Sequence, residues 1–139
     1  MKYKQFGKKV IIRIDQGEEI VESLTQICNS LKINFGTITG LGAVNKVTIG
    51  LFDTKTKEYH STELTGDHEI APLYGNITSM NNKPYLHLHA NLCDNKHKSF
   101  GGHLNKAIVS ATFEGIIDII DGKVERKFDS NIKLNLLKI

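Results

Sequence analysis

A helical pattern occurs at one place in this chain, and nearly all of the rest is patterned for β-strands. Apolar residues recur at steps of three and four residues between positions 18 and 32, which predicts one amphipathic helix there. The preceding Asp15-Gln16-Gly17-Glu18 has the spacing of a capping box, with Asp15 as the N-cap and Glu18 reaching back toward it. We therefore expect an α+β fold, with one domain over residues 1–139, a largely antiparallel sheet and one main helix. The helical stripe consists of Ile20, Leu24, Ile27, Cys28 and Leu31.

Short polar turns separate the expected strands. Gly40-Leu41-Gly42 predicts a bend, residues 94–102 form a polar loop that ends in glycines, and Asp121-Gly122 predicts a hairpin between the strands on either side. Alternating or β-branched runs predict the strands themselves, at residues 10–14, 35–39, 44–52, 59–64, 69–79, 85–92, 108–120, 124–128 and 132–136.

The composition is that of an ordinary folded protein, with 40% hydrophobic and 24% charged residues. No apolar run approaches the ~20 residues of a transmembrane helix, and the start of the chain lacks the apolar core of a signal peptide. These features predict a cytoplasmic protein with no membrane partner, in which Cys28 and Cys93 are reduced and unbridged. The net charge of +3 comes from sixteen lysines and two arginines, Arg13 and Arg126. Because base readout in the major groove relies on arginine, we expect nucleic-acid binding to be weak or indirect.

Three histidines are the strongest candidates for a functional site. His87 and His89 lie in the alternating Leu86-His87-Leu88-His89-Ala90, so a strand would place both imidazoles on one face, with Cβ atoms about 6.6 Å apart. From that separation, two imidazoles can bind one ion at about 2.0–2.1 Å. His103 follows Gly101-Gly102 at an expected bend and would complete a three-ligand site with an open fourth position. The alternative is two histidines on the polar face of a strand and one at a bend, with no metal.

An ordered set of short motifs resembles the plants-and-prokaryotes-conserved (PPC) domain family. The two histidine segments are similar to those of its bacterial and archaeal members, which are described as DNA-binding proteins. The resemblance spans nearly the whole chain and rests on Gly40-Leu41-Gly42-Ala43-Val44, Gly50-Leu51-Phe52-Asp53, His68-Glu69-Ile70, Gly75-Asn76-Ile77, Leu86-His87-Leu88-His89-Ala90, Gly101-Gly102-His103-Leu104, Thr112-Phe113-Glu114 and the Leu134-x-Leu136 end.

The resemblance implies a twisted antiparallel sheet, a fold related to that of acetolactate decarboxylase, and assembly into a homotrimer. It also implies that His87, His89 and His103 bind a metal, because they match the H-x-H and G-G-H positions of the family. We expect Zn²⁺, although imidazoles select zinc weakly and iron or nickel would fit as well. Plant relatives bind DNA through separate AT-hook segments with an Arg-Gly-Arg-Pro core, and this chain contains no such segment.

Glu114 is the candidate catalytic residue. A strand over residues 108–120 would place Ser110, Thr112 and Glu114 on one face, where the carboxylate could act as a general base beside a metal-bound water or orient a ligand histidine. The alternative is a glutamate that faces solvent.

Two classes of function follow. The first is a homotrimeric metal-binding module with a regulatory or DNA-associated role and a small anionic ligand. The second is a zinc-dependent enzyme, similar to a decarboxylase or an ester hydrolase, that acts on a small carboxylate or carbonyl substrate.

Overall fold

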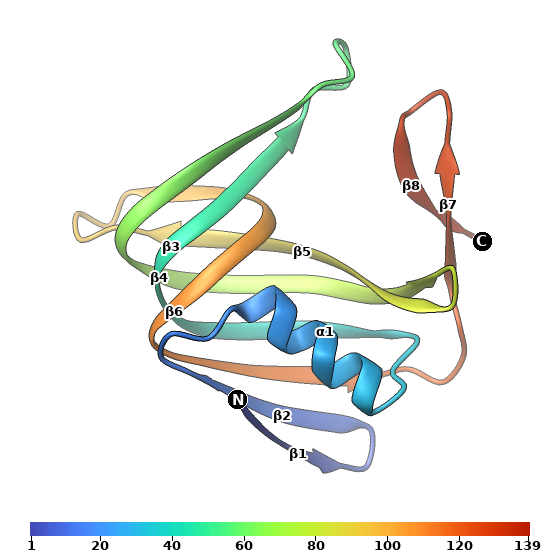
Figure 1. The fold of residues 1–139 in the computed structure, drawn as a ribbon, viewed down its shortest axis with the longest axis horizontal. Helices are drawn as coiled ribbons and strands as arrows, with labels where there is room; N and C mark the ends of the chain where they lie inside the picture. The colour runs from blue at the N-terminus through green and yellow to red at the C-terminus, as the bar shows by residue number, and fades with distance from the viewer.

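One eight-stranded sheet and one helix make up the computed structural model, which describes residues 1–139 (Figure 1). This confirms the expected combination of a sheet and one main helix, although β-strands dominate more than in most α+β proteins. The elements, in chain order, are β1 (Lys2–Phe6), β2 (Lys9–Asp15), α1 (Ile20–Ser30), β3 (Gly36–Phe52), β4 (Tyr59–Met80), β5 (Lys83–Cys93), β6 (Ser99–Ile119), β7 (Glu125–Asp129) and β8 (Leu134–Lys138).

Four strands form a closed circuit in the middle of the sheet. β3 pairs with β4 and β6, and β5 also pairs with β4 and β6. All pairings in the sheet are antiparallel except the one between β4 and β7. The long strands bend at β-bulges, which add a residue to one strand and increase its local twist. This bending lets one sheet curl until β5 meets β6.

The expected bend at Gly40-Leu41-Gly42 is such a bulge inside one continuous strand, β3, rather than a break between two strands. A Cβ atom at Gly42 would lie 2.3 Å from the carbonyl oxygen of Thr112, and the φ of Gly42 is +156°. Only glycine fits this close approach of β3 and β6. The expected breaks inside β4 and β6 are likewise absent, because each of these strands is continuous.

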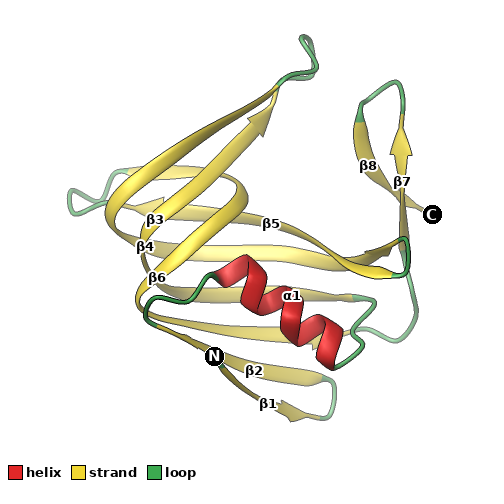
Figure 2. Cartoon of the chain, viewed as in Figure 1, coloured by secondary structure: helices red, strands yellow, loops and turns green.

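The helix α1 packs against β5 and β6 with the predicted apolar stripe, and Ile20, Leu24, Ile27 and Cys28 are buried (Figure 2). Its predicted N-cap is wrong. The helix begins at Ile20 and is capped by Glu19, whose carboxylate accepts hydrogen bonds from the backbone N–H groups of Val21 and Glu22. Glu18 does accept a hydrogen bond from the backbone N–H of Asp15, so the reach-back exists, but it closes the turn before the helix.

A single cluster of 22 buried apolar residues fills the space between the helix and the curled sheet. Phe113 of β6 is fully buried in it and packs against Gly40 and Gly115. A Cβ atom would lie 2.3 Å from the phenyl ring at Gly40 and 2.8 Å from it at Gly115.

Cys28 is buried and Cys93 half-buried, and both are free thiols as predicted. Burial raises the pKa of the Cys28 thiol to about 12, so it is not a reactive group.

Two hairpins project from the same side of the molecule, away from β1 and β2 (Figure 1). One is the outer end of β3 and β4, closed by a turn over residues 53–57. The other is β7 and β8. The predicted hairpin at Asp121-Gly122 is wrong, because β7 does not pair with β6. It pairs with β8 and, through Glu125 and Ser79, with β4.

No helix in the structure combines the length and the apolar character needed to span a membrane.

Candidate metal centre

His87 and His89 share one face of β5, as the alternating pattern predicts. Leu88 and Ala90 are buried on the opposite face, and Leu86 packs against the same core. The apolar residues therefore fix which way the strand faces, and the two imidazoles must point away from the core.

His103 reaches the same place from the neighbouring strand. It lies on β6 and is the direct register partner of His89 on β5. The predicted loop over residues 94–102 is too long, because β6 already begins at Ser99. Gly102 instead permits a close approach of strands, since a Cβ atom there would lie 2.8 Å from the carbonyl oxygen of Gly50 on β3. Strand pairing, and not a flexible bend, brings His103 to the other two.

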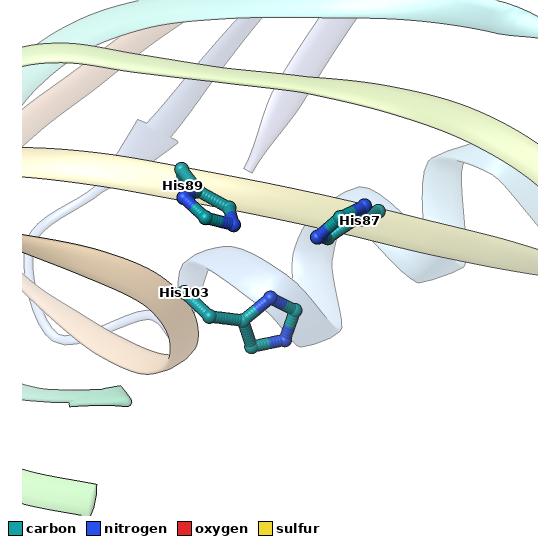
Figure 3. A group of neighbouring side chains, drawn as sticks. All are labelled: His87, His89 and His103. Carbon is teal, nitrogen blue, oxygen red and sulfur yellow. The ribbon is translucent and has the colours of Figure 1, made fainter. Parts of the chain in front are cut away.

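The three imidazoles converge, and we call His87, His89 and His103 the histidine cluster (Figure 3). Their ring centroids are 5.1 Å apart for His87 and His89, 5.2 Å for His87 and His103, and 5.6 Å for His89 and His103. One nitrogen from each ring lies within 4.8 Å of the others. Tetrahedral bonding at about 2.0–2.1 Å places ligand atoms about 3.3 Å apart, a spacing that small rotations of the imidazoles would reach.

The protonation of the cluster suits metal binding. Burial is the largest cause that lowers the pKa of His87, to about 4, and the positive charges of Arg126, His103 and His89 lower it further. Burial, followed by the charge of His89, also lowers the pKa of His103. Both imidazoles are therefore neutral at physiological pH, which is the form that binds a metal. The donor set fits Zn²⁺ or another divalent transition metal.

The histidine cluster opens into a pocket of about 700 Å³. β5 and β6 contribute the histidines, and the two projecting hairpins contribute the sides. No aspartate or glutamate lines this pocket. The lining residues are Gly50, Leu51, Phe52, Tyr59, Tyr85, His87, His89, Gly101, Gly102, His103, Asn105, Arg126, Leu134, Asn135 and Leu136.

Tyr59 supports His103 from the β3–β4 hairpin. Its ring meets the imidazole of His103 edge-on at 6.3 Å between centroids, and its hydroxyl donates to Oδ1 of Asn105 at 2.7 Å. A Cβ atom at Gly50 would lie 2.0 Å from the hydroxyl oxygen of Tyr59. Gly50 therefore leaves the space in which Tyr59 packs beside the cluster.

Arg126 is the charged residue of the pocket that sequence reasoning missed. It lies on β7 and donates three hydrogen bonds of 2.8 Å, from Nε to Oγ1 of Thr78, from Nη1 to the carbonyl of Asn135 and from Nη2 to Oδ1 of Asn76. Its guanidinium also lies 4.8 Å from the centre of the Tyr85 ring. The only signal in the sequence is that Arg126 is one of two arginines among sixteen lysines.

The candidate catalytic residue lies elsewhere, and so does Glu69 of the His68-Glu69-Ile70 motif. Glu114 is exposed, pairs across the sheet with Arg13 and Leu41, and does not line the pocket. Glu69 lines a separate pocket of about 420 Å³ together with His68. The structure therefore brings together the three histidines but not Glu114, whose catalytic role stays a prediction.

Known proteins resemble this chain in sequence and in fold. The sequence profile of the Plants and Prokaryotes Conserved domain (PCC, also written PPC) matches residues 1–121. The chain belongs to this family. The match confirms the resemblance inferred from the motifs. No functionally curated protein matches the PPC chain closely enough to count as a relative.

Solved structures show the same PPC fold over nearly the whole chain. A candidate DNA-binding protein from Bacteroides thetaiotaomicron is 34% identical, with a TM-score of 0.96 over 99% of this chain and 96% of that one. A metal-containing protein from Archaeoglobus fulgidus is 31% identical, with a TM-score of 0.88 over the full length of both chains. A PPC protein from Pyrococcus horikoshii is 27% identical, with a TM-score of 0.84 over 97% of this chain and 94% of that one.

Proposed function

We propose that this PPC-domain protein binds one divalent transition metal, most simply Zn²⁺, through His87, His89 and His103, and holds a small anionic ligand in the pocket beside it. The observation that carries the proposal is the convergence of three imidazole nitrogens within 4.8 Å at a pocket of about 700 Å³. The similarity to the metal-containing protein from Archaeoglobus fulgidus supports it.

With three protein ligands, a bound metal would keep an open fourth position beside the pocket. A metal with such an open position polarises a carbonyl or lowers the pKa of a bound water. The three histidines would hold the ion, and Tyr59 packs against His103. Because the imidazoles of His87 and His103 are neutral, they would release no proton on binding.

Elemental analysis of the purified protein tests the metal site. We expect about one zinc per chain in the wild type and a large loss of zinc in His89→Ala, which removes a ligand. The control His97→Ala should keep its zinc, because His97 lies in the turn before β6 and outside the cluster. Equal metal content in His89→Ala and the wild type would overturn the assignment.

A zinc-dependent enzyme, similar to a decarboxylase or an ester hydrolase, is the second candidate, and the open metal position favours it. The pocket contains no carboxylate that could act as a general base, so binding explains the lining better than proton transfer does. Hydrolysis of 4-nitrophenyl acetate by the zinc-loaded protein, compared with His89→Ala, distinguishes the two. Turnover that depends on His89 would favour the enzyme.

Assembly into a homotrimer belongs to the same proposal. Large apolar side chains are exposed on the two projecting hairpins, including Leu51 at 69% and Phe128 at 52%. Exposed apolar surface of this kind is typical of a subunit interface. Light scattering at micromolar concentration should give three times the chain mass of 15.5 kDa, and a mass near one chain would refute it.

A further inference from the structure

Arg126 lies on the same face of the sheet as the histidine cluster. Its Nη2 donates to Asn76, which is the direct partner of His87 across the β4–β5 ladder, and its Nε donates to Thr78, the partner of Tyr85. Directly opposed residues of an antiparallel pair share a face, with Cβ atoms about 4.5–5.5 Å apart. The hydrogen bond to Asn76 therefore holds the guanidinium on the face of the sheet that carries His87.

The charge of Arg126 has no partner within the chain. None of the ion pairs in the structure includes Arg126, and no acidic residue lines the pocket. A half-buried cation of this kind is costly unless an anion balances it. With a divalent metal in the histidine cluster, the positive charge in the pocket would be larger still.

Arg126 also keeps donors free. A guanidinium has five N–H groups, and the three bonds to Thr78, Asn135 and Asn76 leave one on each terminal nitrogen. The same three bonds and the Tyr85 ring hold the guanidinium in place before any ligand arrives, which lowers the entropy cost of binding.

We infer that the pocket binds a small organic carboxylate, whose two oxygens accept hydrogen bonds from the terminal nitrogens of Arg126 and whose apolar part lies against the leucines of the two hairpins. The inference rests on the proposed function, because the metal adds its charge to the same pocket. Two free donors on a planar fork suit a carboxylate. The apolar lining of Leu51, Phe52, Leu134 and Leu136 suits an organic body and not a bare inorganic anion.

Calorimetric titration of the zinc-loaded protein tests the inference, with phenylacetate as the probe and phenylacetamide and inorganic phosphate as comparisons. We expect phenylacetate to bind, and the neutral amide and phosphate to bind at least about tenfold more weakly. Arg126→Gln should weaken phenylacetate binding by about tenfold or more while zinc content stays unchanged. Arg13 is the other arginine of the chain and lies outside the pocket, so Arg13→Gln should change neither phenylacetate affinity nor zinc content.

Two further measurements keep the result interpretable. If circular dichroism shows that Arg126→Gln has lost structure, Arg126→Lys retains the charge without the paired donors and should still bind phenylacetate more weakly than the wild type. Arg126→Gln should also weaken phenylacetate binding when it is combined with His89→Ala. This comparison tests the role of Arg126 without the metal site, so a failure of the metal site can be told apart from a failure of this inference. Equal phenylacetate affinity in folded Arg126 variants and wild type, or tighter binding of phosphate than of phenylacetate, would overturn it.

Discussion

The acid behaviour of His87 gives the most direct test of the geometry of the cluster. Burial and the nearby charges lower its pKa to about 4, against about 6.5 for an exposed histidine. At pH 5, protons compete with a metal for the imidazole nitrogen. This competition would weaken metal binding about 33-fold at a histidine with a pKa of about 6.5, but only about 1.1-fold at His87 with its pKa of about 4. We therefore expect His87 to remain neutral in the metal-free protein down to about pH 4.

Nuclear magnetic resonance of the imidazole nitrogens measures this titration, with the His87 signal assigned by its loss in His87→Gln. The unfolded protein in urea should titrate near 6.5. Because the folded protein takes up this proton at lower pH than the unfolded chain, the contribution of His87 to stability is present above about pH 6.5 and is lost as the pH falls toward 4. Arg126→Gln should raise the pKa of His87, since it removes one of the charges that lower it, and Arg13→Gln should not. A folded-state midpoint near 6.5 would refute the buried, charged environment described for the cluster.

Three other predictions concern the same region. Leu88→Ala empties a buried position directly between His87 and His89 and should lower the free energy of unfolding by about 2–5 kcal/mol in urea titrations, whereas the exposed Leu51→Ala should cost far less. Glu114→Gln should leave zinc content unchanged, because Glu114 does not line the pocket, and a loss of zinc would restore it to the site. DNA titrations should show weak binding that disappears between low and near-physiological salt, because lysines contact phosphates without reading bases, and tight sequence-selective binding at the higher salt would contradict this.

Local patterns predicted the parts of the site that depend on one strand. The period-two alternation around Leu88 fixes which face of β5 carries His87 and His89, and burial of Leu88 confirms it. His103 was also found, although its glycines suggested a bend. What holds it in place is the register between β5 and β6, a pairing that a local pattern does not encode.

Long-range pairing explains the errors as well. Asp121-Gly122 carries a strong turn signal, but such a signal does not determine which edge of a sheet the next strand joins, and β7 continues beside β4 instead of returning along β6. The same crossover brings Arg126 to the pocket, 23 positions after His103 in the sequence and adjacent to His87 in space. β1 was missed because all five of its residues are exposed. A strand with no buried face shows no alternation of apolar and polar residues in its sequence.

The match to the family covers residues 1–121, whereas Arg126, Leu134, Asn135 and Leu136 come from the β7–β8 hairpin that follows. The three histidines and the arginine that would bind a carboxylate thus occupy separate stretches of chain, although Leu51 and Phe52 of the apolar lining lie within the matched stretch. Exchanging or truncating the C-terminal hairpin would change what the pocket accepts while leaving the three imidazoles in place. Proteins grouped by the H-x-H and G-G-H motifs alone could therefore share a metal and differ in ligand, and functional assignments within the group should be transferred only when the terminal hairpin is also alike.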